Sequence, residues 1–258
     1  MNLIIDAGNT KIKWAVYQYG QLLKKQIGST WDDLDLPVLL SSFPGITKCI
    51  LSSTRAEWTQ LEAVMQAKSI SFFRLNHQMS LPIRLAYETP ETLGLDRIAG
   101  AAGAQHTFPG ENVLIIDAGT AITYDVLSSE GLFLGGNISP GIEIRFRCLN
   151  RYTDNLPLVE FNEKFDLDRV DLLGSSTEGA IQAGVQNGIL YEITSYINTL
   201  TNKYKGLRVI LTGGTAEYFV KKLKKTIFVD PNLVLKGLNH ILEHQTGLRL
   251  GDENNYDS

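Results

Sequence analysis

One short segment occurs twice in this chain and constrains the fold more than any other feature. Ile4-Ile5-Asp6-Ala7-Gly8 returns as Ile115-Ile116-Asp117-Ala118-Gly119, and each copy ends an apolar run and is soon followed by threonine, at Thr10 and Thr120. Five residues can match by chance, so a duplication also requires the flanking segments to repeat. The flanks therefore decide whether the chain consists of two similar halves.

The secondary-structure patterns of the flanks repeat in the same order. In the first half they predict strands over 3–6, 12–16, 22–27, 46–51 and 70–75, and helices over 31–42, 55–67 and 91–105. In the second half they predict strands over 113–117, 121–127, 132–137, 207–211 and 227–229, and helices over 142–150, 176–200, 216–223 and 233–244. Each half begins with three strands and continues with alternating helices and strands, which indicates a duplicated α/β fold.

A turn signal at Phe108-Pro109-Gly110 separates the halves, so we expect one domain over 1–110 and a second over 111–258. The 258 residues suffice for two modest domains, each with a core of its own. Two similar halves create a cleft, where ligands usually bind. The two Asp-Ala-Gly turns would face this cleft from opposite sides.

The composition argues against several classes of protein. Apolar residues make up 43% of the chain and charged residues 20%, as is ordinary for a globular protein. The net charge of −4 argues against duplex nucleic acid as a partner, because phosphate binding needs a basic surface. No apolar run approaches the ~18 residues of a membrane span, and Asp6 interrupts the first run before it could form a signal peptide. We therefore expect a cytoplasmic protein with no membrane and no nucleic-acid partner.

The first Asp-Ala-Gly segment has the residue types of a phosphate-binding turn. Glycine lets backbone N–H groups approach an anion, and successive N–H groups in a turn form an anion-binding nest. Lys13 or Lys11 could neutralise a phosphate, whereas Asp6 would be repelled by bare phosphate and is suited to hold Mg²⁺, directly or through water. The alternative is an ordinary hairpin turn, because Asn and Gly are common turn formers.

The second copy favours the phosphate-binding interpretation. Two acid–Gly–Thr turns on opposed halves are what a nucleotide kinase needs to hold a polyphosphate and its cations. Leu211-Thr212-Gly213-Gly214 adds a third turn, in which the glycine pair would let a base or ribose approach the backbone. The same residues could equally form a helix N-cap.

These motifs resemble the superfamily of acetate and sugar kinases, Hsp70 and actin, and within it the type III pantothenate kinases, over nearly the whole chain. The matching segments are Asp6–Lys13, Gly94–Arg97, Asp117–Ala121, Gly135–Gly141 and Leu173–Thr177, in the family's order. The resemblance implies duplicated ribonuclease H-like (actin-like ATPase) domains with a cleft between them. Each domain would be a mixed sheet of three antiparallel strands plus parallel strands, flanked by helices.

The resemblance also implies a reaction, the ATP-dependent phosphorylation of pantothenate to 4′-phosphopantothenate in the first step of coenzyme A biosynthesis. Asp96 would be the general base, Asp117 would bind K⁺ or NH₄⁺, and the protein would be a homodimer. The residues implied to bind ATP phosphates and Mg²⁺ are Asp6, Ala7, Gly8, Asn9, Thr10, Lys11, Ile12 and Lys13, with Thr120 also touching ATP. Those implied to hold pantothenate are Tyr87, Gly94, Leu95, Asp96, Arg97 and Thr177.

Alternatives remain open at this point. Asp96-Arg97 alone is typical of a surface ion pair near a helix start, whereas in a kinase Arg97 would keep the carboxylate ionised and ready to accept a proton. A non-catalytic regulator of the same fold would be favoured by loss of the base or of a phosphate turn, and neither is missing. A kinase of another small alcohol, such as a sugar, fits the turns but not segments 94–97 and 173–177.

Three further features are assigned structural roles. His240-Ile241-Leu242-Glu243-His244 fits a zinc-protease pattern, but we interpret it as the solvated face of a helix. Cys49 and Cys148 lack metal-ligand spacing and are expected to be buried core thiols in a reducing compartment. The small residues of Gly100–Ala104 allow close helix packing, either within the core or across a dimer.

Overall fold

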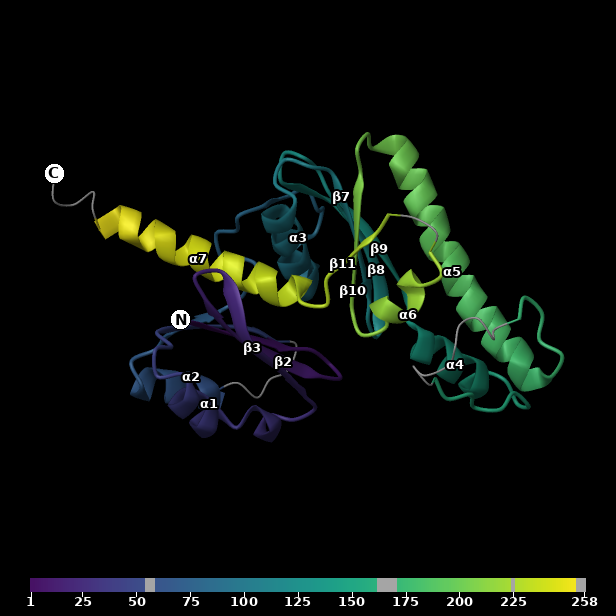
Figure 1. The fold of residues 1–258 in the computed structure, drawn as a ribbon, viewed down its shortest axis with the longest axis horizontal. Helices are drawn as coiled ribbons and strands as arrows, with labels where there is room; N and C mark the ends of the chain where they lie inside the picture. Colours follow the sequence, from purple (N-terminus) through teal and green to yellow (C-terminus); the bar gives the residue numbers. More distant parts are fainter. Residues whose placement is uncertain (54–58, 162–170, 224–225, 254–258) are drawn as a thin grey trace. The chain divides into compact units, whose positions relative to one another are not determined.

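A computed structural model describes residues 1–53, 59–161, 171–223 and 226–253 (Figure 1). The chain divides into two compact units, unit 1 with Met1–Thr107 and Asn232–Ser258, and unit 2 with Phe108–Pro231. This division differs from the sequence-based one, because the C-terminal segment packs with the first half of the chain. The boundary of the duplicated halves at residue 110 stays a prediction.

Unit 1 is built on a mixed sheet with the order β3-β2-β1-β4-β5. Its strands are β1 (Asn2–Ala7), β2 (Ile12–Gln18), β3 (Gln21–Gly28), β4 (Lys48–Ser53) and β5 (Ser71–Arg74). The first three strands are antiparallel, whereas β4 runs parallel to both β1 and β5. A short strand, β6 (Arg84–Leu85), follows later in the chain.

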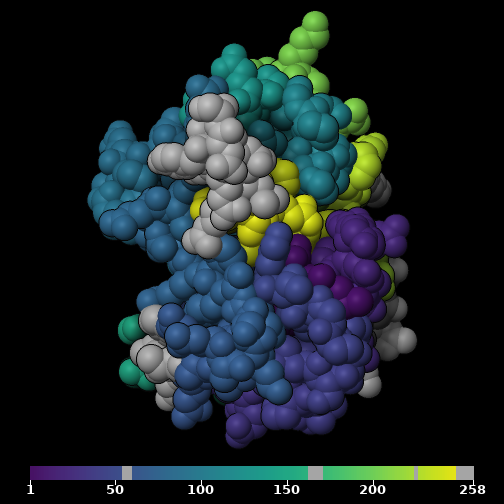
Figure 2. All heavy atoms as spheres, turned by 90° about the vertical axis from the view of Figure 1, so that its left-hand side faces the viewer, coloured from purple at the N-terminus to yellow at the C-terminus, as the bar shows by residue number. Residues whose placement is uncertain are grey.

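Helices cover both faces of the unit 1 sheet. They are α1 (Leu36–Ser42), α2 (Thr59–Ala67), α3 (Leu95–Thr107) and α7 (Leu233–Glu253), with short 3-10 helices η1 (Asp32–Leu34) and η2 (Pro90–Thr92). Leu39 of α1 and Met65 of α2 pack with one face of β1, and α7 packs on the other face (Figure 1). In Figure 2 the yellow atoms of α7 lie against the purple atoms of the first strands.

Small residues let α3 and α7 pack closely within unit 1. A Cβ atom on Gly103 would lie 2.3 Å from the Leu233 carbonyl oxygen, and one on Gly237 would lie 1.7 Å from the Ala99 carbonyl oxygen. Neither position can hold a side chain without moving a backbone. The small-residue segment 100–104 therefore serves the core of unit 1.

Unit 2 repeats the sheet of unit 1 strand for strand. Its strands are β7 (Val113–Ala118), β8 (Ala121–Leu127), β9 (Leu132–Pro140), β10 (Arg208–Thr212) and β11 (Phe228–Val229). They have the order β11-β10-β7-β8-β9, with β7, β8 and β9 antiparallel and β10 parallel to β7 and β11. Its helices are α4 (Ile142–Arg151), α5 (Thr177–Lys203) and α6 (Ala216–Val220). The predicted mixed sheets of three antiparallel strands plus parallel strands are confirmed in both units.

Several local expectations need correction. Strand β9 extends to Pro140, three residues beyond its predicted end, and α7 continues to Glu253, into the polar tail. Cys49 is buried as expected, but Cys148 is exposed because it lies on the outer side of α4. Among the described residues, no helix combines the length and apolar character needed to span a membrane.

The histidines of α7 do not form the solvated face that the pattern predicted. His240 is half-buried, and the centre of its ring lies 4.8 Å from that of His106. His244 is also half-buried, and its Nε2 lies 3.2 Å from Ser80 Oγ. Within the residues that the structure describes, no group of three His, Cys, Asp or Glu side chains could hold a metal ion.

Candidate active site

The first Asp-Ala-Gly segment forms the turn between β1 and β2. Asp6 pairs with Lys13 and Ala7 with Ile12, and the Gly8 N–H donates to the Lys11 carbonyl oxygen at 3.1 Å. The side chains of Asn9, Thr10 and Lys11 are exposed on this turn, whereas those of Ala7 and Ile12 belong to the core of unit 1. Any contact that Ala7 and Ile12 make with a ligand must therefore come from their backbone.

Asp6 is a buried carboxyl group between two charged side chains. It is 9% exposed, and burial raises its pKa from 3.8 to about 6, against the opposing effect of Lys13. The charge of Asp96 raises this pKa further. Asp6, Lys13 and Asp96 therefore lie close enough in unit 1 for their charges to interact. A buried carboxylate beside a second carboxylate fits a site for a cation with oxygen ligands.

Asp96 lies in the first turn of α3, with its carboxylate folded back onto the start of the helix. Its Oδ1 accepts a hydrogen bond of 2.9 Å from the Arg97 backbone N–H. A Cβ atom on Gly94 would lie 2.5 Å from the same oxygen, so the glycine leaves room for the carboxylate. Asp96 itself is exposed, as a group that accepts a proton from a substrate must be.

The guanidinium group of Arg97 contacts an aromatic ring. Arg97 is buried, and its Cζ lies 5.6 Å from the centre of the Tyr87 ring, a cation–π arrangement. Tyr87 and Arg97 thus form a pair beside Asp96, which fits their implied role around pantothenate. The sequence analysis paired Arg97 with Asp96 and did not predict the contact between the Arg97 side chain and Tyr87. Tyr87 and Arg97 lie ten residues apart, in different local segments.

The second Asp-Ala-Gly segment forms the corresponding turn in unit 2. Asp117 pairs with Thr123 across β7 and β8, and the Gly119 N–H donates to the Ala121 carbonyl oxygen at 3.1 Å. Asp117 is half-buried and Thr120 is exposed. The hairpin of unit 1 is therefore repeated, with an uncharged residue opposite the acid.

The Thr-Gly-Gly turn packs directly on this second turn. Gly213 has a φ of +97°, and a Cβ atom there would lie 2.4 Å from Asp117 Oδ1 and 2.5 Å from the Ala118 carbonyl carbon. Thr215 donates to the Ala118 carbonyl oxygen through its backbone N–H, at 3.1 Å, and through its Oγ1, at 2.8 Å. The sequence treated 117–121 and 211–214 as separate motifs, and the parallel pairing of β7 with β10 joins them.

A third segment, at the end of β9, also contacts the second turn. The Gly141 N–H donates to the Thr120 carbonyl oxygen at 3.1 Å. A Cβ atom on Gly141 would lie 2.3 Å from that oxygen and 2.5 Å from the Gly119 carbonyl oxygen. The segment 135–141, which the resemblance singled out, therefore ends against the Thr120 turn.

Thr177 begins α5 in unit 2, whereas the other residues implied to hold pantothenate are in unit 1. Ser176 caps the helix, since its Oγ accepts a hydrogen bond of 3.1 Å from the Gly179 N–H. A Cβ atom on Gly174 would lie 2.1 Å from the Ala180 nitrogen, so the preceding loop packs closely on the first helical turn. These contacts fix Thr177 at an exposed helix start.

Comparison with known families gives one consistent result. The family model of type III pantothenate kinase matches residues 2–199. The type III pantothenate kinase of Christiangramia forsetii is 45% identical over 244 residues, which cover 94% of this chain and 98% of that protein. The type III pantothenate kinase of Phocaeicola vulgatus is 42% identical over 251 residues, which cover 96% of this chain and all 100% of that protein.

Solved structures of more distant proteins share the fold. A Campylobacter jejuni protein described as a Baf family transcriptional activator aligns with a TM-score of 0.61 at 22% identity, over 95% of this chain and 99% of its own. A Listeria monocytogenes protein described as an N-acetylmannosamine kinase aligns with a TM-score of 0.55 at 13% identity, over 94% of this chain and 99% of its own. These likenesses concern the fold alone, whereas the matches in sequence identify the family: the chain belongs to the type III pantothenate kinases.

Proposed function

We propose that this protein transfers the γ-phosphoryl group of ATP to the 4′-hydroxyl of pantothenate, with Asp96 as the general base. The observation that carries the proposal is the pairing of Asp6 with Lys13 across β1 and β2, together with the charge of Asp96, which also raises the pKa of Asp6. A kinase needs a turn that binds phosphate, a positive charge beside it and an exposed carboxylate that can act as a base. Lys13 and Asp96 provide the last two in unit 1.

The proposed step is an in-line displacement at the γ-phosphorus. Asp96 accepts the proton of the 4′-hydroxyl while the hydroxyl oxygen forms a bond to phosphorus. The bond between that phosphorus and the bridging oxygen of ADP breaks, and ADP leaves with the electron pair. A positioned carboxylate base contributes about 10²–10⁴-fold to such a rate, and the remaining acceleration comes from positioning and charge stabilisation.

The first turn would hold the phosphates of ATP. The backbone of residues 7–12 and the exposed side chains of Asn9, Thr10 and Lys11 supply donors, and Lys13 supplies positive charge. Asp6 fits an Mg²⁺ site, because its pKa of about 6 reflects a buried carboxylate that a cation would stabilise. Magnesium would neutralise charge that develops on the phosphate oxygens.

The second turn would hold the monovalent cation. Asp117 offers a half-buried carboxylate. The Gly213 backbone packs directly against its Oδ1, since a Cβ atom added to Gly213 would lie 2.4 Å from that oxygen. Oxygen ligands of this kind suit hard cations such as K⁺, and they also accept hydrogen bonds from NH₄⁺. Thr120 would touch ATP from the same turn.

Pantothenate would be held by Gly94, Leu95, Asp96, Arg97 and Tyr87 of unit 1 and by Thr177 of unit 2. The buried Arg97 carries a positive charge suited to the anionic substrate, and the Tyr87 ring fixes its guanidinium. A homodimer in the cytoplasm, with ATP, Mg²⁺ and K⁺ or NH₄⁺, completes the proposal.

The test is product formation from ATP and pantothenate in the presence of Mg²⁺, with either K⁺ or Na⁺ as the monovalent cation. Phosphopantothenate that forms only with K⁺ would support the substrate, the reaction and the cation together. Binding of pantothenate without any product would favour a regulator of the same fold. Phosphorylation of a sugar in place of pantothenate would make the protein a kinase of a different alcohol.

A further inference from the structure

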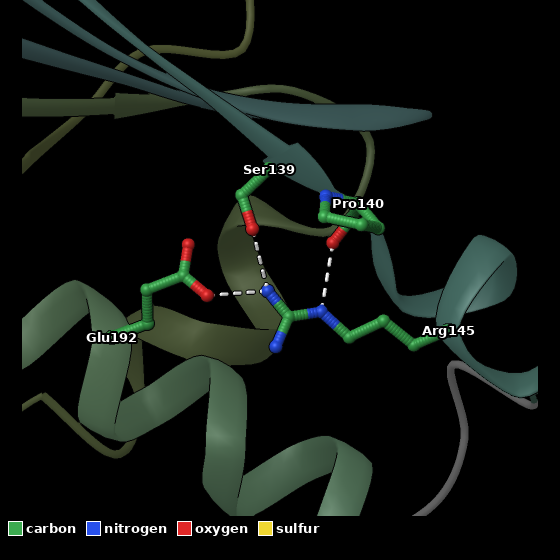
Figure 3. Close-up of polar contacts among 4 residues, drawn as sticks. All are labelled: Ser139, Pro140, Arg145 and Glu192. Atoms are coloured by element: carbon green, nitrogen blue, oxygen red, sulfur yellow. Dashed lines mark hydrogen bonds and ion pairs between the residues drawn. The ribbon is translucent and has the colours of Figure 1, made fainter.

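Arg145, a residue that none of the sequence motifs includes, joins three elements of unit 2 (Figure 3). From α4 its Nε donates to the Pro140 carbonyl oxygen at 2.8 Å, and its Nη2 donates to Ser139 Oγ at 2.8 Å. The same Nη2 forms an ion pair with Glu192 Oε2 of α5 at 2.5 Å. One guanidinium group therefore connects the end of β9 with both helices.

The ion pair lies largely out of water. The side chains of Arg145 and Glu192 are 20% and 24% exposed. Burial acts to raise the pKa of Glu192, but hydrogen bonds from Arg145 and Ser139 outweigh it and hold this pKa below its ordinary value. The carboxylate is thus charged at neutral pH, and charge-assisted hydrogen bonds of this type fix geometry as well as adding stability.

The segment that Arg145 holds is the one that contacts the Thr120 turn. Pro140 pairs with Ala121, the first residue of β8 after the turn. The next residue, Gly141, donates to the Thr120 carbonyl oxygen at 3.1 Å and accepts a hydrogen bond of 3.0 Å from the Arg145 backbone N–H. Arg145 thus contacts this segment through both its side chain and its backbone. The segment packs so closely on the turn that a Cβ atom added to Gly141 would lie 2.3 Å from the Thr120 carbonyl oxygen.

We propose that Arg145 is a positioning residue for the nucleotide, which holds Ser139-Pro140-Gly141 beneath the Thr120 turn and so keeps this turn in its ATP-binding geometry. The proposal rests on the proposed function, in which Thr120 touches ATP. A purely structural role would lower the stability of unit 2 and leave the nucleotide affinity of the folded enzyme unchanged. The two roles therefore differ in a measurable quantity.

The experiment replaces Arg145 by methionine, which keeps the apolar stem and removes all donors. We expect the Kd for ADP with Mg²⁺, and the KM for ATP, to rise about 10- to 100-fold, the effect of a displacement of about 1 Å at a binding group. The KM for pantothenate should stay at its wild-type value. The matched control is Arg147→Met on the same helix, where the side chain is 75% exposed and pairs with Glu143 at 3.6 Å. This control should behave as wild type.

Two further variants keep the test decisive if Arg145→Met folds poorly. Arg145→Lys keeps the charge but loses the planar fork, and Glu192→Gln removes the charge of the partner. Each should raise the Kd for ADP by less than Arg145→Met, and their combination should be non-additive. A wild-type Kd in folded variants with a lowered Tm would overturn the proposal, as would an equal rise in the KM for pantothenate. Because ADP binding is measured apart from turnover, a wild-type protein that binds ADP without phosphorylating pantothenate would overturn the proposed function alone.

Discussion

The two Asp-Ala-Gly turns have the same sequence and each forms a hairpin, but the residues opposite their acids differ in charge. In unit 1 the residue paired with Asp6 is Lys13, and in unit 2 the residue paired with Asp117 is Thr123. Side chains opposite each other on antiparallel strands are close neighbours. The first turn therefore supplies a cation from the chain, whereas the second places a hydroxyl at the same position.

Asp6 and Asp117 also differ in their burial and in the groups around them. Asp6 is buried and its pKa is raised further by the charge of Asp96, whereas Asp117 is half-buried and packs directly against the Gly213 backbone. The comparison teaches that the two copies keep the same hairpin while the charge and the burial around their acids differ.

The turns also differ in length. Four residues separate the paired positions Ala7 and Ile12, but only three separate Ala118 and Ile122. The extra residue of the first turn exposes Asn9, Thr10 and Lys11 together. The first turn thus offers more donors for phosphate oxygens, which agrees with the larger role proposed for it.

The largest effect is expected from Asp96→Asn, because the proposed reaction assigns the general base to Asp96, near the first turn. The amide keeps an oxygen for the Arg97 N–H but cannot take a proton, so kcat should fall about 10²–10⁴-fold. Isothermal titration should show unchanged binding of ADP and pantothenate. Glu62→Gln, an exposed change on α2, is the control and should keep full turnover. Near-normal turnover of Asp96→Asn would remove Asp96 as the base.

The buried charge of Asp6 should be visible in the pH dependence of stability. Its pKa is about 6 in the folded protein and 3.8 when exposed, so the folded state binds this proton more tightly. Its contribution to the free energy of unfolding is therefore greatest in acid, falls as pH rises from about 4 to about 6, and is constant above. The loss corresponds to roughly 3 kcal/mol. Asp6→Asn should remove this fall and should also stabilise the protein without ligand at pH 7.

The measurement is urea unfolding of Asp6→Asn and wild type from about pH 3 to about pH 8, a range that brackets both pKa values, 3.8 and about 6. Asp33→Asn is a control of opposite sign, because hydrogen bonds from Thr30 and Ser29 lower the pKa of Asp33 in the folded state. Its stabilising contribution is present above its ordinary pKa and is lost as pH falls. If Asp6→Asn and wild type show the same pH dependence, the buried-charge explanation is wrong.

The sequence predicted the sheets because each strand carries its own pattern. The alternation at Ile12, Trp14 and Val16 and the repeated apolar runs before Asp6 and Asp117 are local signals, and the structure confirms the strands that they predict. No local pattern, however, shows which part of the chain the last helix packs against. Apolar spacing predicts that 233–244 is helical, but the placement of α7 in unit 1 depends on close approach between Gly237 and Ala99, far apart in the chain.

The same distinction applies to the candidate site. The motifs predicted the turn residues, because a turn needs glycine and its polar residues are contiguous. The role of Asp96 as a base was implied only by the resemblance to the family. The contact of Arg97 with Tyr87, that of Gly213 with Asp117, and the ion pair of Arg145 with Glu192 join residues from separate elements. Their spacing in the sequence follows from strand pairing and helix packing, which a single sequence does not display.

Gly213→Ala tests the close packing of the Thr-Gly-Gly turn against Asp117. Alanine at a φ of +97° is strained, and its Cβ would lie 2.4 Å from Asp117 Oδ1, so we expect a loss of about 1–3 kcal/mol in the free energy of unfolding. The control is the neighbouring Gly214→Ala, where nothing lies within 4 Å of the added Cβ. Equal stabilities of the two variants in urea unfolding would show that Gly213 is not needed for this contact.

The smallest effect, and the most specific, is expected from Asp117→Asn. Removing the charge leaves the hairpin intact, since the pairing of Asp117 with Thr123 uses the backbone. The K⁺ concentration for half-maximal activity should rise at least about tenfold, the cost of losing a metal-binding group, while the pH dependence that Asp6 causes stays unchanged. The rate is measured as a function of KCl concentration, with NaCl added to keep the ionic strength constant.

Asp154→Asn, an exposed change in the same unit, is the control and should respond to K⁺ as wild type does. An unchanged K⁺ response of Asp117→Asn would place the cation elsewhere, and the absence of a lysine opposite Asp117 would then need a different explanation.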